Sequence, residues 1–119
     1  MSTDKARGMT TTILHSDLEF PIEHFSVLKP MHTAVAYGYR DSHDLAKVFK
    51  NEMPGYTYGR QGNPTTTALE SKITKMEDGL ATSCFSTGMA AIASTFLALI
   101  RAGDHVVSSM YLFGNTSGL

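Results

Sequence analysis

The fold is decided by residues 80–110, which read LATSCFSTGMAAIASTFLALIRAGDHVVSSM. Residues 80–85 form a short, largely apolar run typical of a buried strand, and residues 86–88 predict a tight turn. An apolar helix is predicted over residues 89–102, and a second strand over residues 105–110. Strand, turn, helix and strand in this order form a βαβ unit with a right-handed crossover and parallel strands. Because parallel strands are buried on both faces, their weak polar alternation agrees with an α/β protein.

Two parallel strands joined by one crossover are not a stable sheet. Residues 111–119 indicate a loop that leads into a further helix. The sequence therefore predicts the first part of a larger α/β domain, incomplete in this chain. We divide the chain into an N-terminal arm with a short helix, residues 1–53, and the truncated beginning of a large domain, residues 54–119.

Composition excludes several classes of protein. The 119 residues include 10 Lys and Arg against 11 Asp and Glu, so the formal net charge is -1. This balance provides no general attraction to nucleic acid or to an anionic membrane. With 42% hydrophobic and 18% charged residues, the chain is not of the fully disordered class. The single cysteine, Cys84, cannot form an internal disulfide, which favours a reducing, cytoplasmic setting.

The sequence shows no targeting or membrane segment. The N-terminal stretch has Lys5 and Arg7 but lacks the apolar core of a secretory signal. The longest apolar-dominated run, Met89 to Ile100, is about 12 residues, whereas a membrane-spanning helix needs roughly 20. We therefore expect a soluble protein without a membrane partner.

The first 40 residues show little periodicity. Pro21 and Pro30 interrupt any long helix. We interpret residues 1–40 as an extended arm that lies on a body or reaches a neighbouring subunit, with a flexible tail as the alternative.

A short amphipathic helix is predicted after the arm. Asp41 or Ser42 can cap it, and Leu45, Val48 and Phe49 follow the i, i+3, i+4 spacing of one apolar face. Residues 54–63 (PGYTYGRQGN) then predict a loop.

A second helix is predicted to open at Asn63 and Pro64, because Asn is a good N-cap and Pro is tolerated at the first helical position. Gly79 is the predicted C-terminal stop. One apolar stripe repeats at spacings of 4, 3 and 4, and consists of Leu69, Ile73, Met76 and Leu80.

Two segments contain candidate anion-binding residues. A turn that opens a helix presents unpaired backbone N–H groups, so Ser86, Thr87, Gly88 and Met89 suit a phosphate; the alternative is an ordinary turn capped by Ser or Thr. In the loop at 56–63, Tyr58 and Arg60 occupy alternating positions and could address one anion. The alternative for this loop is a solvated segment with a packed tyrosine.

The remaining polar candidates point to structural roles. No pair of histidines has a metal-ligand spacing, and Cys84 suits a small buried thiol better than a nucleophile. We therefore expect no metal site. The histidines interpreted as surface or structural residues are His15, His24, His32, His43 and His105.

Four ordered motifs resemble the Cys/Met-metabolism (trans-sulfuration) family of pyridoxal-phosphate (PLP) enzymes. The first is YGRQGNPT at residues 58–65, followed by FSTGMAA at 85–91, RAGDHVV at 101–107 and LFGNT at 112–116. The resemblance implies the aspartate-aminotransferase-like fold (fold type I), with a large domain around a mostly parallel sheet.

The resemblance also implies how the cofactor is held. Ser86, Gly88 and Met89 would bind the PLP phosphate, the last two through backbone N–H groups. Tyr58 and Arg60 would reach the phosphate of the neighbouring subunit, which implies a homo-oligomer built as a dimer of dimers.

Phe113 matches an aromatic position, often tyrosine, that stacks on the pyridine ring of the cofactor. Phenylalanine retains the stacking but has no hydroxyl for proton transfer.

We assign no catalytic residue to this chain. Family enzymes hold PLP as a Schiff base with a serine-flanked lysine and pair its pyridine nitrogen with an aspartate, and the resemblance places both downstream of these motifs. The substrate-carboxylate arginine is also absent from this chain. None of the lysines matches that pattern; they are Lys5, Lys29, Lys47, Lys50, Lys72 and Lys75.

The implied function is that of the N-terminal part of a PLP enzyme performing γ-replacement on an O-acylhomoserine, as in cystathionine γ-synthase or a sulfhydrylase. A γ-lyase acting on cystathionine or methionine is the alternative within the family. From another class, the chain could be a non-catalytic remnant. A small amino acid would be the substrate.

Overall fold

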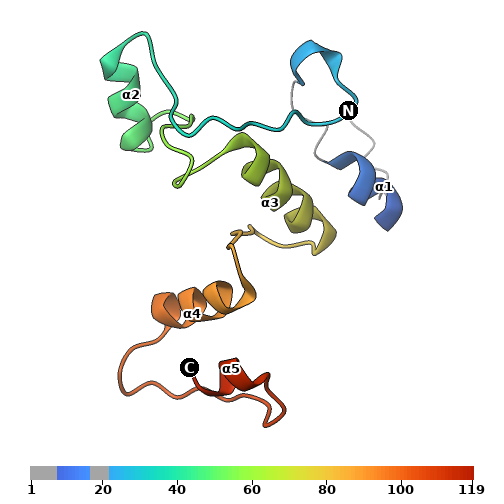
Figure 1. Cartoon of the computed structure of the whole chain (residues 1–119), viewed down its shortest axis with the longest axis vertical. Coiled ribbons are helices and arrows are strands. Elements are labelled where there is room, and N and C mark those ends of the chain that lie inside the picture. The colour runs from blue at the N-terminus through green and yellow to red at the C-terminus, as the bar shows by residue number, and fades with distance from the viewer. Residues whose placement is uncertain (1–7, 17–21) are drawn as a thin grey trace. The chain divides into compact units, whose positions relative to one another are not determined.

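The computed structural model describes residues 8–16 and 22–119. Six helical segments follow one another in this part of the chain (Figure 1): α1 (Met9–His15), the 3₁₀ turn η2 (Glu23–Phe25), α2 (Ser42–Phe49), α3 (Pro64–Met76), α4 (Gly88–Leu99) and α5 (Gly114–Ser117). They divide into two compact units, Met1–Thr82 and Ser83–Leu119. None of the described helices is long and apolar enough to cross a membrane.

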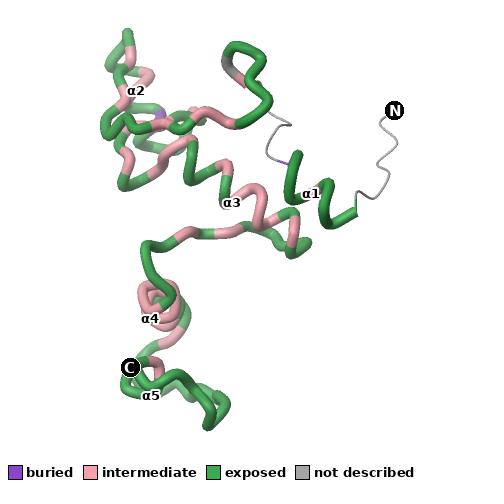
Figure 2. Tube along the Cα trace, turned by 45° about the vertical axis from the view of Figure 1, so that its right-hand side comes forward, coloured by how far each residue is buried: buried purple, intermediate pink, exposed green. Residues whose placement is uncertain are grey.

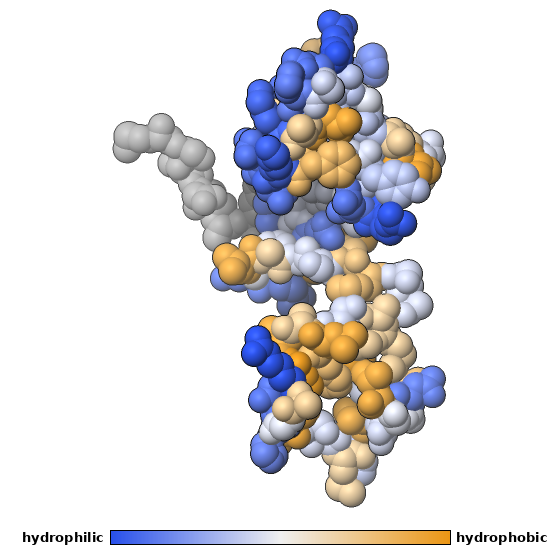
Figure 3. All heavy atoms as spheres, turned by 90° about the vertical axis from the view of Figure 1, so that its left-hand side faces the viewer, coloured by the Kyte–Doolittle hydropathy of each residue, from blue (hydrophilic) through white to orange (hydrophobic). Residues whose placement is uncertain are grey.

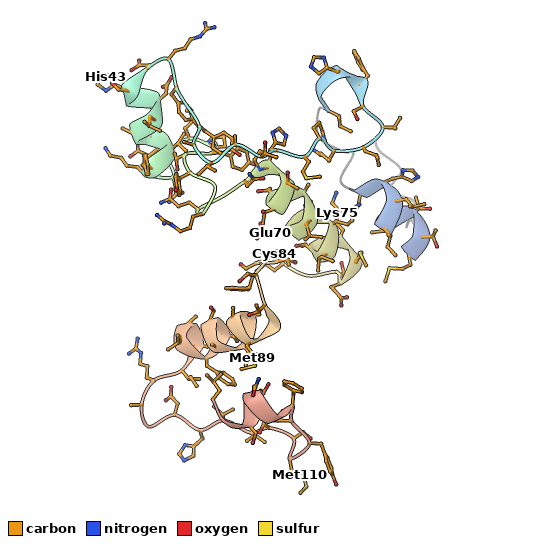
Figure 4. The ribbon with its side chains drawn as sticks, in the orientation of Figure 1. His43, Glu70, Lys75, Cys84, Met89 and Met110 are labelled. Carbon is orange, nitrogen blue, oxygen red and sulfur yellow. The ribbon has the colours of Figure 1, made fainter. Side chains whose placement is uncertain are left out.

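The sequence predicted an extended arm over residues 1–40, but part of this arm is helical. Its residues Met9–His15 form α1, although the three consecutive threonines there are poor helix formers. Contact with α3 stabilises this helix, and the ammonium of Lys75, labelled in Figure 4, lies on α3. It donates a 3.0 Å hydrogen bond to the Ser16 carbonyl at the C-terminus of α1. Residues 1–7 and 17–21 of the predicted arm, with Pro21, lie outside the described residues.

The helices predicted after the arm are confirmed, with their N-caps. The Asp41 side chain accepts a hydrogen bond from the His43 N–H at the start of α2. The Asn63 side chain does the same for the Thr65 N–H at the start of α3, where Pro64 takes the first helical position. Short polar side chains at N-caps satisfy N–H groups that lack an intrahelical partner, which explains where both helices begin.

The C-terminal ends of α2 and α3 use left-handed residues other than glycine. Asn51 has φ 58° and Asp78 has φ 49°, a region that Asn and Asp enter more readily than other side chains. The Gly79 N–H then donates to the Thr74 carbonyl at 2.9 Å, as in a Schellman motif. The prediction of Gly79 as the stop was therefore wrong by one position.

The predicted strands at 80–85 and 105–110 are not formed within the described residues. Both segments are irregular chain, and Leu80 and Val107 are fully exposed. A parallel strand is stabilised by ladder bonds to its neighbours and by cover on both faces, and no neighbouring strand pairs with either segment in the described chain. The strand-like pairing that does occur is an isolated antiparallel bridge between Ala36 and Tyr58.

The apolar helix between these segments is confirmed but is shorter than predicted. It begins at Gly88 and ends at Leu99, and Ile100 is already extended. Beyond it, the Arg101 N–H donates to the Asp104 carboxylate at 2.7 Å, closing a turn that contains Gly103 at φ 101°. This turn, and not a further helical turn, carries the chain out of α4.

Burial is slight in both units. Among the described apolar side chains, Val48 is the one that is buried, with 8% of its surface exposed. Figure 2 shows most of α4 at intermediate exposure. The predicted apolar stripe of α3 is half-covered, because Ile73 and Met76 are of intermediate exposure whereas Leu69 is 50% exposed.

Candidate functional site

The loop that carries Tyr58 and Arg60 is held by backbone pairing with the arm. The Gly59 N–H donates to the Val35 carbonyl at 2.6 Å, and the Tyr37 N–H donates to the Thr57 carbonyl at 3.1 Å. These two bonds flank Tyr58, so the backbone of that residue is fixed by a segment more than 20 residues earlier in the chain.

A tight turn follows and brings the two predicted side chains together. The Tyr58 carbonyl accepts hydrogen bonds from the N–H groups of Gln61 and Gly62, at 2.9 and 3.1 Å. The Arg60 guanidinium carbon lies 5.1 Å from the centroid of the Tyr58 ring, within the range of a cation–π contact. Both side chains are exposed, with Tyr58 at 40%. The turn therefore presents a positive charge and a phenol side by side.

The second candidate segment is the N-terminus of α4. The Thr87 hydroxyl caps the helix by accepting a 3.0 Å hydrogen bond from the Ala90 N–H, so the turn has the Ser/Thr cap that the sequence allowed. Within the described residues, the N–H groups of Gly88 and Met89 make no hydrogen bond. Ser86, immediately before the cap, is exposed.

The open backbone at Gly88 is accessible to a ligand. A Cβ placed on Gly88 would meet no atom within 4 Å. Unpaired N–H groups at the positive end of a helix dipole favour an anion, and the Ser86 hydroxyl can add a further donor. This donor set fits a phosphate group chemically.

Met89 and Phe113 lie in the same unit as this helix end. Met89 is on the first turn of α4 (Figure 4), and its sulfur accepts a 3.6 Å hydrogen bond from the Thr116 hydroxyl of α5. Phe113 is the N-cap residue of α5, and its carbonyl accepts from the Thr116 and Ser117 N–H groups at 2.9 and 3.1 Å. The Phe113 ring is 74% exposed.

The structure thus groups the predicted residues by unit. Tyr58 and Arg60 meet in Met1–Thr82, and the four remaining residues belong to Ser83–Leu119: Ser86, Gly88, Met89 and Phe113. In the described part of the chain, no three His, Cys, Asp or Glu side chains gather in a metal-binding group.

Two features of the first unit were missed from the sequence. One is a cavity of about 400 Å³ whose lining carries no charged side chain; it is lined by Val48, Phe49, Asn51, Gly55, Tyr56, Thr57, Gln61, Gly62 and Thr67. The other is the set of contacts that the Asn63 amide makes with the arm. The Asn63 contacts join segments 26 to 31 residues apart, so no local sequence signal could have revealed them.

A comparison with protein families identifies this set of motifs. The sequence profile described as "Cys/Met metabolism PLP-dependent enzyme" matches residues 10–119. The chain belongs to this family. Its members are PLP-dependent enzymes of cysteine and methionine metabolism, so the resemblance predicted from the four motifs is confirmed.

Individual relatives from the Cys/Met metabolism family agree over nearly the whole chain. The L-methionine gamma-lyase of Fusobacterium nucleatum subsp. nucleatum is 36% identical over 115 residues, covering 97% of this chain and 29% of the lyase. The homocysteine/cysteine synthase of Saccharomyces cerevisiae is 36% identical over 108 residues, covering 89% of this chain and 24% of the synthase. The chain spans roughly a quarter of the length of these relatives.

A solved structure from the family supports the predicted fold class. A putative O-acetylhomoserine (thiol)-lyase of Campylobacter jejuni subsp. jejuni, crystallised with N'-pyridoxyl-lysine-5'-monophosphate, matches with a TM-score of 0.84 at 26% identity. The match covers 93% of this chain and 27% of that one. The backbone is therefore that of the N-terminal region of a fold type I PLP enzyme, which is an α/β fold.

Proposed function

We propose that the protein carrying this chain is a PLP-dependent enzyme that performs γ-replacement on an O-acylhomoserine, of the cystathionine γ-synthase or sulfhydrylase type. Family membership supports the use of PLP and an amino-acid substrate. The names of the yeast homocysteine/cysteine synthase and the Campylobacter O-acetylhomoserine (thiol)-lyase support replacement by a thiol. When bound, PLP supplies an electron sink for the bonds around the amino-acid α-carbon.

The observation that carries this proposal is the pair of unpaired N–H groups at the start of α4. We assign the PLP phosphate to the N–H groups of Gly88 and Met89 and to the Ser86 hydroxyl. Because Thr87 already caps the Ala90 N–H, the helix end is stable before a ligand arrives, and the two remaining donors are available to an anion.

The other predicted residues complete the proposed site. Tyr58 and Arg60 would bind the phosphate held by a neighbouring copy of the chain, within a dimer of dimers. A guanidinium already stacked on a phenol has lost part of its freedom, so it binds an anion at a smaller entropic cost. Phe113 would stack on the pyridine ring. The enzyme would act in the cytoplasm, and the residues of the large domain would begin at residue 54.

A γ-lyase is the second candidate, favoured by the 36% identity to the Fusobacterium methionine gamma-lyase. Replacement and elimination can be separated by product analysis of the purified protein. We expect O-acetylhomoserine and sulfide to give homocysteine and acetate. Release of methanethiol from methionine, without homocysteine formation from O-acetylhomoserine, would instead establish the lyase.

The phosphate assignment is tested by removing a single donor. Gly88→Pro deletes the N–H at the first helical position, where proline is tolerated, and Thr87 is already extended (φ -146°, ψ 156°) as a residue before proline should be. We expect the dissociation constant for PLP to rise about tenfold, since a hydrogen bond to a charged group contributes roughly 1.5 kcal/mol or more. Gly88→Ala, which keeps the N–H, is the matched control. Equal affinities for the two variants would contradict the assignment.

A chemical experiment addresses the catalytic lysine. We expect that borohydride reduction of this chain mixed with PLP modifies no single lysine stoichiometrically, because the family resemblance places the catalytic lysine downstream of these motifs. Mass spectrometry of the reduced chain gives the result. Stoichiometric modification of one lysine would overturn this expectation, whereas failure of the complete protein to bind PLP would favour a non-catalytic remnant.

A further inference from the structure

The side-chain amide of Asn63 joins two parts of the first unit that lie far apart in the sequence, the start of α3 and residues 32–37 of the arm. As the N-cap of α3, it accepts a hydrogen bond from the Thr65 N–H through Oδ1 at 2.9 Å. The same amide donates through Nδ2 to the carbonyl of His32 at 3.1 Å and to the hydroxyl of Tyr37 at 3.1 Å. The Ala34 carbonyl lies at 3.4 Å from this nitrogen.

These contacts define which end of the amide faces which partner. Oδ1 faces a backbone donor, and Nδ2 faces two backbone carbonyls and a hydroxyl. A carboxylate at the same position could still cap α3, but it would place a negative charge against the carbonyl oxygens of the arm. The arm contacts thus require an amide, whereas the helix cap does not.

The arm is also bound at a second point on the first turn of α3. The His32 N–H donates to the Thr65 hydroxyl at 2.8 Å, so both backbone groups of His32 bond to this turn. The chain from His32 to Tyr37 is therefore anchored before it reaches the loop that carries Tyr58.

The anchored segment then pairs with that loop. The bonds from Gly59 to Val35 and from Tyr37 to Thr57 lie on either side of Tyr58, and the Tyr37 and Tyr56 rings are 5.5 Å apart. Tyr37 both bonds to Asn63 through its hydroxyl and pairs with the loop through its backbone. A change at Asn63 can therefore reach the loop through Tyr37 and through the arm residues on either side of Val35.

We infer that Asn63 is a positioning residue, which orders the loop carrying Tyr58 and Arg60 by fastening residues 32–37 of the arm to the first turn of α3. The hydrogen bonds of Asn63 and Tyr37 support the ordering of the loop. The expected effect of this ordering on phosphate binding rests on the proposed function. Asn63 itself does not touch the cofactor in this scheme.

The test replaces the amide while keeping the cap. In the full chain, Asn63→Asp retains the Oδ1 acceptor, and hydrogen exchange is measured at individual amides. We expect the N–H groups of Tyr37 and Gly59 to exchange at least about tenfold faster than in the unsubstituted chain. The Thr67 N–H, which donates to the Asn63 carbonyl at 2.9 Å within α3, should keep its protection. The matched control is Asp41→Asn, which makes the reverse change at the cap of α2 without touching the arm.

A second, uncharged variant controls for the negative charge that Asn63→Asp introduces. Asn63→Ser also caps well but has no amide, so it should accelerate the same two amides in the same direction. Unchanged exchange at Tyr37 and Gly59 in both variants would overturn the inference. So would rapid, coil-like exchange of these two amides in the unsubstituted chain, which can be measured even if a variant does not fold.

The effect of the substitution on PLP affinity is measured separately, in the complete protein. We expect Asn63→Asp to weaken PLP binding about fivefold and to leave binding of pyridoxal, which lacks the phosphate, unchanged. If Arg60→Ala also leaves PLP affinity unchanged, the proposed role of the loop in phosphate binding fails, while the exchange data still decide the positioning role.

Discussion

The two units of the chain are held together in different ways. In Met1–Thr82, polar side chains bond segments that are 26 to 59 residues apart, as in the bonds from Asn63 to Tyr37 and from Lys75 to the Ser16 carbonyl. In Ser83–Leu119, the side-chain bonds of Thr87, Thr95, Asp104 and Ser109 join residues two to four positions apart, whereas the bond from Thr116 to Met89 spans 27 residues. The first unit is defined by specific polar contacts and the second by an apolar helix.

This difference agrees with the surfaces of the two units. α4 (GMAAIASTFLAL) contains no charged residue, yet Leu97 and Leu99 are 85% and 76% exposed. Figure 3 shows apolar side chains at the surface. A helix that is apolar all round is normally buried in a protein interior. The second unit therefore has an interior-type helix whose apolar side chains Leu97 and Leu99 are exposed. Matched substitutions in the two units can test this contrast.

The largest effect is expected at a glycine of the first unit. A Cβ on Gly55 would collide with the Tyr39 hydroxyl and lie 3.0 Å from a methyl group of Val48. Gly55→Ala should lower the free energy of unfolding by about 2 kcal/mol, in the range of overpacking. Gly88→Ala, where the Cβ meets open space, should change it by less than about 0.5 kcal/mol. Urea unfolding curves measure the free energy of unfolding of both variants. Equal losses of stability would show that Gly55 and Gly88 do not differ in how closely they are packed.

A pair of valines tests burial directly. Val48 is 8% exposed and Val107 is 99% exposed. Val48→Ala should cost roughly 1.5 to 2 kcal/mol from lost transfer free energy and the cavity left behind. Val107→Ala in the same chain should stay within about 0.5 kcal/mol. A cost at Val107 as large as that at Val48 would show that the surface of the second unit is covered in solution.

The helix caps should give similar, smaller effects in both units. Thr87→Ala and Asp41→Ala each remove a side-chain acceptor for a helix N–H, and each should cost about 1 kcal/mol. Thr87→Ser, which keeps the hydroxyl, is the control. Helical content measured by circular dichroism checks this, and a loss in the serine variant as large as in the alanine variant would exclude capping as the cause.

The smallest effect is expected at the ion pair of α2. Lys47 and Asp44 lie 3.1 Å apart at the surface, with 51% and 42% of their side chains exposed. Lys47→Ala should reduce stability by no more than about 0.5 kcal/mol, and added salt should remove most of that difference. A larger, salt-independent loss would indicate that Lys47 acts through packing.

Local sequence signals predicted α2, α3 and α4, with each N-terminal end correct to within one residue, but they did not predict α1. Asp41, Asn63 and Thr87 cap helices because their side chains reach an N–H only two or three residues ahead, and such contacts depend little on the rest of the chain. The same locality explains why the loop at 54–63 was predicted correctly.

The wrong predictions concern features that depend on distant neighbours. The strands at 80–85 and 105–110 require other strands to pair with, and α1 forms in the supposedly extended arm because it contacts α3. At the end of α3, Asp78 takes the left-handed position assigned to Gly79, which shows that the preference of glycine for this conformation is not exclusive.

The sequence by itself determined the family, the helix caps and the residues proposed to bind phosphate, because each depends on residue types at short, fixed spacings. The tertiary structure alone decided that the Asn63 amide bonds to the arm at His32 and Tyr37. Such contacts bring together atoms from segments whose separation along the chain imposes no spacing rule. Only the folded backbone sets the distances between them.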